Sequence, residues 1–211
     1  MKTNNYWNHF KTITMHKWEV FKLCCKFGIV WRGFVHDLSK YTPREFLSSA
    51  KYFQGYRSPI EAEKEANGYS LAWLHHKGVN LHHWQHWYDW DNVKPCAVRM
   101  PMKYIYELVA DSIAAGKVYN KADKREWNIK QPYNYYKEVN RKHSEGKMEF
   151  VTRMILDHIY VDIMNCGIDE VAKRIRKKYY QNMLPDIKDK DGREVIDNIV
   201  EYNKLVQEYY N

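Results

Sequence analysis

Residues 31–46 decide the expected fold, and they read Trp-Arg-Gly-Phe-Val-His-Asp-Leu-Ser-Lys-Tyr-Thr-Pro-Arg-Glu-Phe. At their centre, His36 and Asp37 end an apolar run and offer an imidazole nitrogen and a carboxylate oxygen to one cation. This donor pair suits borderline divalent metals. Lys40 follows about one helical turn later, so its ammonium is expected beside the pair. Residues 42–45 then form a Thr-x-x-Glu capping box with proline at the first helical position. The pair is therefore expected just before a corner between two helices.

Length and composition favour one ordered, mostly helical domain. The chain has 211 residues, of which 45% are apolar, with only six prolines and nine glycines. It is long enough to bury a substantial core. No stretch of about 18 residues is apolar and free of charge, and the N-terminus lacks the apolar core of a signal peptide. The four cysteines show no Cys-x-x-Cys spacing. We therefore expect a reduced, cytoplasmic protein with no membrane association, whose metal chemistry uses His and Asp.

The positive charge is concentrated in the first part of the chain. Residues 1–120 hold 16 Lys/Arg and 10 Asp/Glu, a net +6, whereas residues 121–211 hold 18 and 16, a net +2. The excess thus lies in the half that contains His36 and Asp37. Such a field favours an anionic partner, either a small phosphate compound or nucleic acid.

Apolar periodicity, capping residues and glycines predict an all-α protein. A second capping box, Ser-Pro-Ile-Glu at 58–61, begins a helix that is predicted to run into the histidine-rich residues 71–87. A polar loop is expected at 88–99. The predicted helices are 6–27, 29–38, 43–53, the one beginning after Ser58, 101–116, 132–143, 147–165, 168–182 and 192–210.

The first predicted helix is apolar on nearly all sides. One face carries Trp7, Phe10, Trp18, Phe21 and Cys25, and a neighbouring face carries Ile13, His16, Val20 and Phe27. A helix that is apolar all round is expected to be buried. His16 then projects into an apolar interior, where an unpaired imidazole is costly. It is either a satisfied core histidine or a metal ligand.

Residues 75–86 contain five of the ten histidines of the chain. His75 and His82, or His76 and His83, are seven apart and share a face if the helix continues through Gly78. A surface tract with incidental metal affinity is the alternative. Neighbouring tryptophans favour a buried tract.

Asp111 lies on an apolar stripe of the helix predicted at 101–116. A carboxylate in that position needs a cation, a metal or several hydrogen-bond donors. Separate helices thus offer His16, then His36 and Asp37, then the histidine tract, and finally Asp111.

This order resembles the HD-domain metallohydrolase superfamily. The His-Asp-x-x-Lys form, the paired histidines, and a proline ten residues before the final Asp look most like its multi-metal branch, which includes the HD-GYP phosphodiesterases. A closer match is an uncharacterised family of short HD-like proteins of bacteria and phages, covering about residues 9–120. The Gly-Tyr-Pro motif is absent and the middle histidines are closely spaced, which argues against a cyclic dinucleotide substrate.

The resemblance implies an HD-like helical bundle with additional C-terminal helices. Residues 1–120 would form the metal-binding core, and residues 121–211 would be helices packed on it within a single domain. One or two divalent metals (Mn, Fe, Co or Zn) are implied, with Asp37 bridging. The implied metal ligands are His16, His36, Asp37 and Asp111 for one ion, and about two of His75, His76, His82 and His83 for the other.

The implied reaction is hydrolysis of a phosphate ester, most simply in a nucleotide. Asp37 and Lys40 would carry the catalysis, and Lys40 with Arg44 would bind the substrate. Two alternatives remain. HD folds include diiron oxygenases, which a six-ligand His/Asp site suits equally. A basic, tyrosine-rich helical protein could also be a non-enzymatic module that binds nucleic acid or a partner protein, with a steep salt dependence.

Overall fold

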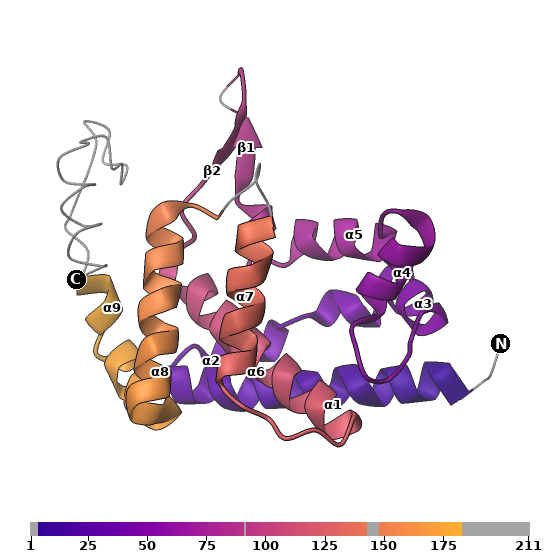
Figure 1. Ribbon diagram of the computed structural model, residues 1–211, viewed down its shortest axis with the longest axis horizontal. Helices are drawn as coiled ribbons and strands as arrows, with labels where there is room; N and C mark the ends of the chain where they lie inside the picture. Colours follow the sequence, from indigo (N-terminus) through magenta and orange to yellow (C-terminus); the bar gives the residue numbers. More distant parts are fainter. Residues whose placement is uncertain (1–3, 91, 143–147, 183–211) are drawn as a thin grey trace.

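The computed structural model describes residues 4–90, 92–142 and 148–182, and the expected all-α fold is confirmed (Figure 1). Within these ranges the elements are helices and 3-10 turns, together with one short antiparallel hairpin that occupies part of the loop expected at 88–99. The helix predicted at 192–210 lies outside the described residues. In chain order the elements are α1 (Asn4–Phe27), α2 (Val30–Val35), η1 (Leu38–Tyr41), α3 (Pro43–Lys51), α4 (Pro59–Asn67), α5 (Leu71–Val79), η2 (Trp84–His86), β1 (Tyr88–Trp90), β2 (Pro95–Ala97), α6 (Met102–Ala122), α7 (Lys130–Lys142), α8 (Phe150–Arg176) and α9 (Tyr179–Asn182).

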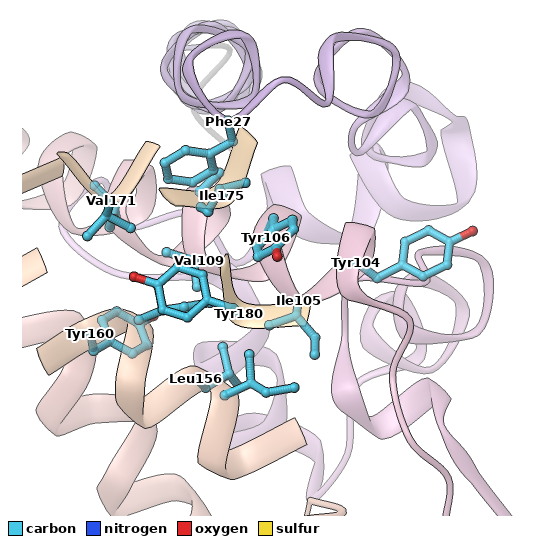
Figure 2. Packing of buried hydrophobic residues seen from close by; sticks show 14 of the residues in the cluster. Phe27, Tyr104, Ile105, Tyr106, Val109, Leu156, Tyr160, Val171, Ile175 and Tyr180 are labelled. Carbon is cyan, nitrogen blue, oxygen red and sulfur yellow. The ribbon is translucent and has the colours of Figure 1, made fainter. Parts of the chain in front are cut away.

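Helix α6 is the centre of the core. It packs against α1, α7 and α8, and the apolar cluster extends from Phe27 of α1 through Ile105 and Val109 of α6 to Leu156 and Tyr160 of α8 (Figure 2). These five residues are at most 2% exposed, as close-packed cores require. The core therefore fixes α1 and α6, which carry His16 and Asp111, relative to each other.

The full burial expected for α1 is wrong. Its face with Ile13, His16, Val20 and Phe27 is buried, but Trp7 and Trp18 are 55% and 58% exposed. Helix α1 packs on α2, α3, α6 and α8, but these contacts leave Trp7 and Trp18 at the surface. An apolar face in the sequence therefore does not imply that another element of the chain covers it.

Helix α2 approaches α1 closely because Gly33 has no side chain. A Cβ at this position would lie 2.6 Å from the Cβ of Cys24 and 3.1 Å from the Cα of Phe21. This close approach brings the end of α2, with His36, beside His16 of α1.

The helices begin where the capping boxes predicted, but without the predicted side-chain caps. Thr42 precedes α3 and Ser58 precedes α4, yet neither side chain caps its helix, and proline starts each. The Thr42 hydroxyl donates instead to the Ser39 carbonyl at 2.7 Å. Glu45 is buried and turned away from the helix end. Among the described residues, none of the helices combines the length and the apolar character needed to cross a bilayer.

Candidate metal centre

The corner that presents His36 and Asp37 is held by the backbone and by Lys17. Helix α2 ends at Val35, and Asp37 adopts a left-handed conformation with φ of 52°. Aspartate tolerates this region better than most residues. The Lys17 ammonium donates to the carbonyls of Phe34 and His36, both at 2.7 Å. The corner turns both side chains inward, where they are 0% and 2% exposed.

The structure brings together the four residues expected around the first ion. Ligand atoms of His16, His36, Asp37 and Asp111 all lie within 4.8 Å of one another. The Nε2 atom of His16 is 2.9 Å from Asp111 Oδ1, and Nε2 of His36 is 3.5 Å from the same oxygen. Helix α1, the α2 corner and α6 each contribute to the cluster, although 95 residues separate His16 from Asp111.

Asp37 also belongs to a second cluster with His76, His82 and His83. Helix α5 ends at Val79 and does not continue through the tract as the seven-residue spacing required. His76 comes from α5, while His82 and His83 come from the turn after Asn80, which reverses the chain toward Asp37. Nε2 of His76 is 3.4 Å and Nε2 of His82 is 3.5 Å from Asp37 Oδ1.

The two oxygens of Asp37 face different clusters. Oδ1 faces His76 and His82, whereas Oδ2 is 3.3 Å from His36 Nε2 and 2.6 Å from the Lys40 ammonium. Donors that share one ion through bonds of about 2.0–2.2 Å lie about 3.0–3.5 Å apart. The observed separations match that range, so the geometry suits a carboxylate shared by two cations.

Several buried polar atoms at this centre have the chemistry to bind a cation. Within the described part of the chain, hydrogen-bond partners are absent for His36 Nε2, Asp37 Oδ1, His82 Nε2 and His83 Nε2. Burying such atoms unpaired is costly, and native proteins rarely do so. A divalent metal would satisfy all of them, and a mixed imidazole and carboxylate set suits Mn, Fe, Co or Zn. The residues present therefore fit metal ions.

Two buried glutamates that the sequence analysis did not identify orient the histidines. Glu107 is fully buried on α6, where its Oε1 accepts from His36 Nδ1 at 3.0 Å and lies 3.4 Å from His82 Nδ1. Arg32 holds the same carboxylate from outside, with Nε 2.7 Å from Oε2. Glu107 thus ties one histidine of each cluster to one anchor. Carboxylates in this position fix the tautomer and direction of metal-ligating histidines.

Glu45 performs the corresponding role on the other side. Its oxygens accept from His75 Nδ1 at 2.5 Å and from His76 Nδ1 at 2.8 Å. In the sequence, Glu107 could have been identified from its position one turn before Asp111 on the inner stripe of α6. Glu45 was harder to identify, because the capping box gave that residue another role.

The electrostatics of the centre keep its carboxylates ionised. Burial raises the pKa of Asp37, but the charges of His36 and Lys40 outweigh it and hold that pKa well below the usual range. Burial also raises the pKa of Asp111, but the hydrogen bonds from His16 and His36, together with the charges of His16 and His82, outweigh it and hold this pKa well below the usual range. Burial lowers the pKa of Lys40, but Asp37 more than compensates, so this pKa is raised. The site therefore offers two anions and a retained ammonium in a buried setting.

The sequence of this chain matches the model of one protein family. Residues 5–160 match a family of unknown function, DUF5662. The chain belongs to this family. The matched range includes both clusters, Lys40, Glu45 and Glu107, so the complete centre lies within the part shared with the family. No curated protein and no solved structure matches the chain.

Two predicted site residues of this family member lie outside the clusters. His75 is bound to Glu45 and its side chain is 21% exposed. Arg44 is exposed in the first turn of α3. Of the four histidines considered for a second ion, the structure thus groups His76, His82 and His83 around Asp37.

Single substitutions can separate the roles of the adjacent histidines. We expect His76→Ala to weaken metal binding at the second cluster at least about 100-fold, because it removes a direct donor, and His75→Ala to change it less than about tenfold. Metal content and competition titration with a chromophoric chelator measure both. Equal losses in the two variants would make His75 a ligand as well.

Proposed function

We propose that this protein is a metal-dependent phosphohydrolase related to the HD-domain superfamily, acting on a phosphate ester such as a nucleotide. The observation that carries the proposal is Asp37, which belongs to two His/Asp clusters and has the Lys40 ammonium 2.6 Å from its Oδ2. A carboxylate that belongs to two donor clusters would suit a two-metal site for phosphoryl transfer, and the ammonium beside it would suit a phosphate oxygen. The order of the cluster residues along the chain also agrees with the superfamily resemblance.

His16, His36, Asp37 and Asp111 would hold one ion, and Asp37 with His76, His82 and His83 would hold the other. A divalent metal bound there supplies Lewis acidity and lets water act as a nucleophile near neutral pH. The protein itself holds the ligand side chains in fixed orientations. Glu45 and Glu107 orient the histidines, so the donor set is formed before the substrate arrives.

Lys40 would bind the phosphate. Its side chain is 26% exposed whereas Asp37 is 2% exposed, so the ammonium lies between the buried ligands and solvent. Asp37 would have another positive partner with a cation bound, and Lys40 would then be able to contact a non-bridging phosphate oxygen. Arg44 is four residues further along the chain, and its part in substrate binding stays a prediction.

The position of Lys40 also distinguishes this proposal from a diiron oxygenase. A phosphate substrate carries negative charge that increases toward the transition state and benefits from a fixed ammonium. Dioxygen has no comparable need. The net +6 of residues 1–120 favours an anionic substrate in the same way.

The decisive experiment is a substrate panel on protein purified without chelators and then loaded with Mn, Fe, Co or Zn. Nucleoside mono-, di- and triphosphates, cyclic nucleotides and p-nitrophenyl phosphates are each assayed for phosphate release or phosphodiester cleavage. We expect turnover with one class, abolished by EDTA. Absence of turnover across the panel, together with dioxygen consumption by the iron-loaded protein, would assign the oxygenase instead.

Lys40→Ala should separate metal binding from catalysis. We expect both ions to remain bound, because Lys40 is not a donor to either. Loss of the ammonium should remove about 2–4 kcal/mol of transition-state stabilisation, so that kcat/KM falls about 30- to 1,000-fold. Metal analysis and steady-state kinetics provide the two readouts. Lys103→Ala, which removes a lysine that lies over the Tyr104 ring, is the matched control. Unchanged kcat/KM in Lys40→Ala would exclude the proposed phosphate contact.

A further inference from the structure

Three Trp-x-x-Phe segments lie on the first two helices. They are Trp-Asn-His-Phe at 7–10 and Trp-Glu-Val-Phe at 18–21 on α1, and Trp-Arg-Gly-Phe at 31–34 on α2. In each segment the two rings stack, with centroids 5.6, 5.7 and 5.6 Å apart and planes inclined by 12°, 23° and 26°. The same local arrangement therefore occurs three times.

All three pairs face solvent. Trp7, Trp18 and Trp31 are 55%, 58% and 69% exposed. The two pairs on α1 are eleven residues apart, close to three helical turns, so they share one side of the helix. Helix α2 packs beside Phe21 through Gly33, which places the third pair next to the second. We call this surface, formed by Trp7, Phe10, Trp18, Phe21, Trp31 and Phe34, the aromatic face.

The aromatic face is large for a monomer. A tryptophan or phenylalanine side chain buries about 150–250 Å² when covered, and these are about half exposed, so six of them with neighbouring Met15, Val30 and Leu38 offer roughly 800 Å². That is the area which one partner contributes to a standard protein–protein interface. Isolated monomers rarely leave an apolar patch of this size uncovered.

Three of the cations around the face have acidic partners within the chain, and a fourth, Lys11, lies over the Trp7 ring at 5.1 Å. Lys22 pairs with Glu19 at 2.5 Å, Lys26 pairs with Asp169 at 2.5 Å, and Arg32 pairs with Glu107 at 2.7 Å. Covering the face with a similar surface would therefore bring few uncompensated charges together. An anionic membrane or nucleic acid would find few cations left to bind. The composition, rich in Trp and Phe with charges compensated, is typical of the core of a protein interface.

We infer that the aromatic face binds a second copy of this chain in a two-fold dimer. The pairs at 7–10 and 18–21 lie on either side of Thr14, which is exposed. A two-fold axis that crosses α1 at Thr14 sets the first pair of one protomer against the second pair of the other, and the reverse, as an isologous interface requires. Because each pair is already stacked, little side-chain freedom is lost on association.

This dimer is independent of the proposed hydrolysis. His16 is nine residues from Trp7, which places it half a turn around α1 from the aromatic face. The His16 side of the metal centre thus lies opposite the aromatic face, whereas η1, which carries Lys40, reaches the face through Tyr41, whose hydroxyl donates to Thr14 at 3.2 Å. Loss of the dimer should change neither metal content nor turnover per protomer.

The test is light scattering coupled to size exclusion and sedimentation equilibrium on the full chain, from about 1 to 100 µM. We expect the wild-type protein to be a dimer. Thr14→Arg puts a charge against its own copy at the axis and should weaken dimerisation at least 100-fold, as should Trp18→Glu with Trp31→Glu. Trp90→Glu is the matched control, because Trp90 is 66% exposed on the hairpin, away from the face, and this variant should remain a dimer.

Each other result overturns the inference. A monomeric wild-type protein across the concentration range means that no second copy covers the face. A dimer that persists in both face variants uses another surface. A monomer that cosediments with phosphatidylserine vesicles and loses this property in Trp18→Glu/Trp31→Glu assigns the face to a lipid surface instead. Circular dichroism verifies that Thr14→Arg folds, because this change also removes the acceptor of the Tyr41 hydroxyl, whereas Trp18→Glu/Trp31→Glu leaves that contact intact.

Discussion

Asp37→Asn should release both metal ions and lower kcat/KM at least about 1,000-fold. The change removes the one anionic side chain that belongs to both clusters, and loss of a shared ligand costs several kcal/mol of metal binding and transition-state stabilisation. Asparagine keeps the shape and tolerates the left-handed backbone at this position, where φ is 52°. Elemental analysis after desalting, and phosphate release with the substrate found in the panel, measure the two effects.

The thermal stability of the same variant provides an independent readout. Ions that bind only the folded state stabilise it, so EDTA should lower the Tm of the wild-type protein and leave that of Asp37→Asn unchanged. Asp89→Asn, at an exposed position of the hairpin, is the control and should behave as wild type. Normal metal content in Asp37→Asn would refute the shared-ligand role, whatever the reaction is.

Glu107→Gln should have the second-largest effect, on metal affinity and on folding together. It weakens the hydrogen bonds from His36 and Arg32 and leaves a guanidinium beside an uncharged amide. We expect metal affinity to fall about 10- to 100-fold, as for other residues that orient ligating histidines. Removing one partner of a buried ion pair typically costs about 3–5 kcal/mol of unfolding free energy. Chelator competition and urea unfolding without metal measure these separately.

The pH dependence of the unfolding free energy tests whether the charge of Glu107 causes the loss of stability in Glu107→Gln. Burial disfavours the Glu107 carboxylate, but the hydrogen bonds from His36 and Arg32 and the charge of His82 together outweigh it and lower its pKa from 4.5 to about 2. A lowered folded-state pKa contributes stability above about pH 4.5, and this contribution is lost as the pH falls toward 2. The difference between wild type and Glu107→Gln in EDTA should therefore shrink between pH 5 and pH 3. A constant difference would mean that packing, and not the charge of Glu107, accounts for the loss.

The helical fold was predictable because its signals are local. Prolines at 43 and 59 and glycines at 28 and 167 begin, end or kink helices through their own backbone preferences. The exposure of α1 was not predictable in this way. Apolar residues on two faces of a helix do not reveal how many faces find a partner, since that depends on contacts with α6 and α8 far along the chain.

The candidate site was predictable where residue type alone restricted the alternatives. A histidine and an aspartate on otherwise apolar helix faces need partners, and His16 and Asp111 indeed lie 2.9 Å apart. The histidine tract was harder, because the seven-residue spacing presumed a helix that stops at Val79. Glu45 was assigned to a local cap since its actual partners, His75 and His76, are 30 and 31 residues away. Glu107, by contrast, lies one turn before Asp111 on the buried side of α6, and this position could have identified it.

Gly33 limits which substitutions the family can accept without changing the geometry of the metal centre. A methyl group there would lie 2.6 Å from the Cβ of Cys24, so α2 could accept it only by moving away from α1. Such a shift would carry His36 away from His16 and Asp111. The atoms in the way are a Cβ, which every residue except glycine carries, and the backbone Cα of Phe21 at 3.1 Å, so a smaller side chain at 24 does not make room. Among diverging members of the family, we therefore expect glycine at position 33 wherever the ligand set is kept.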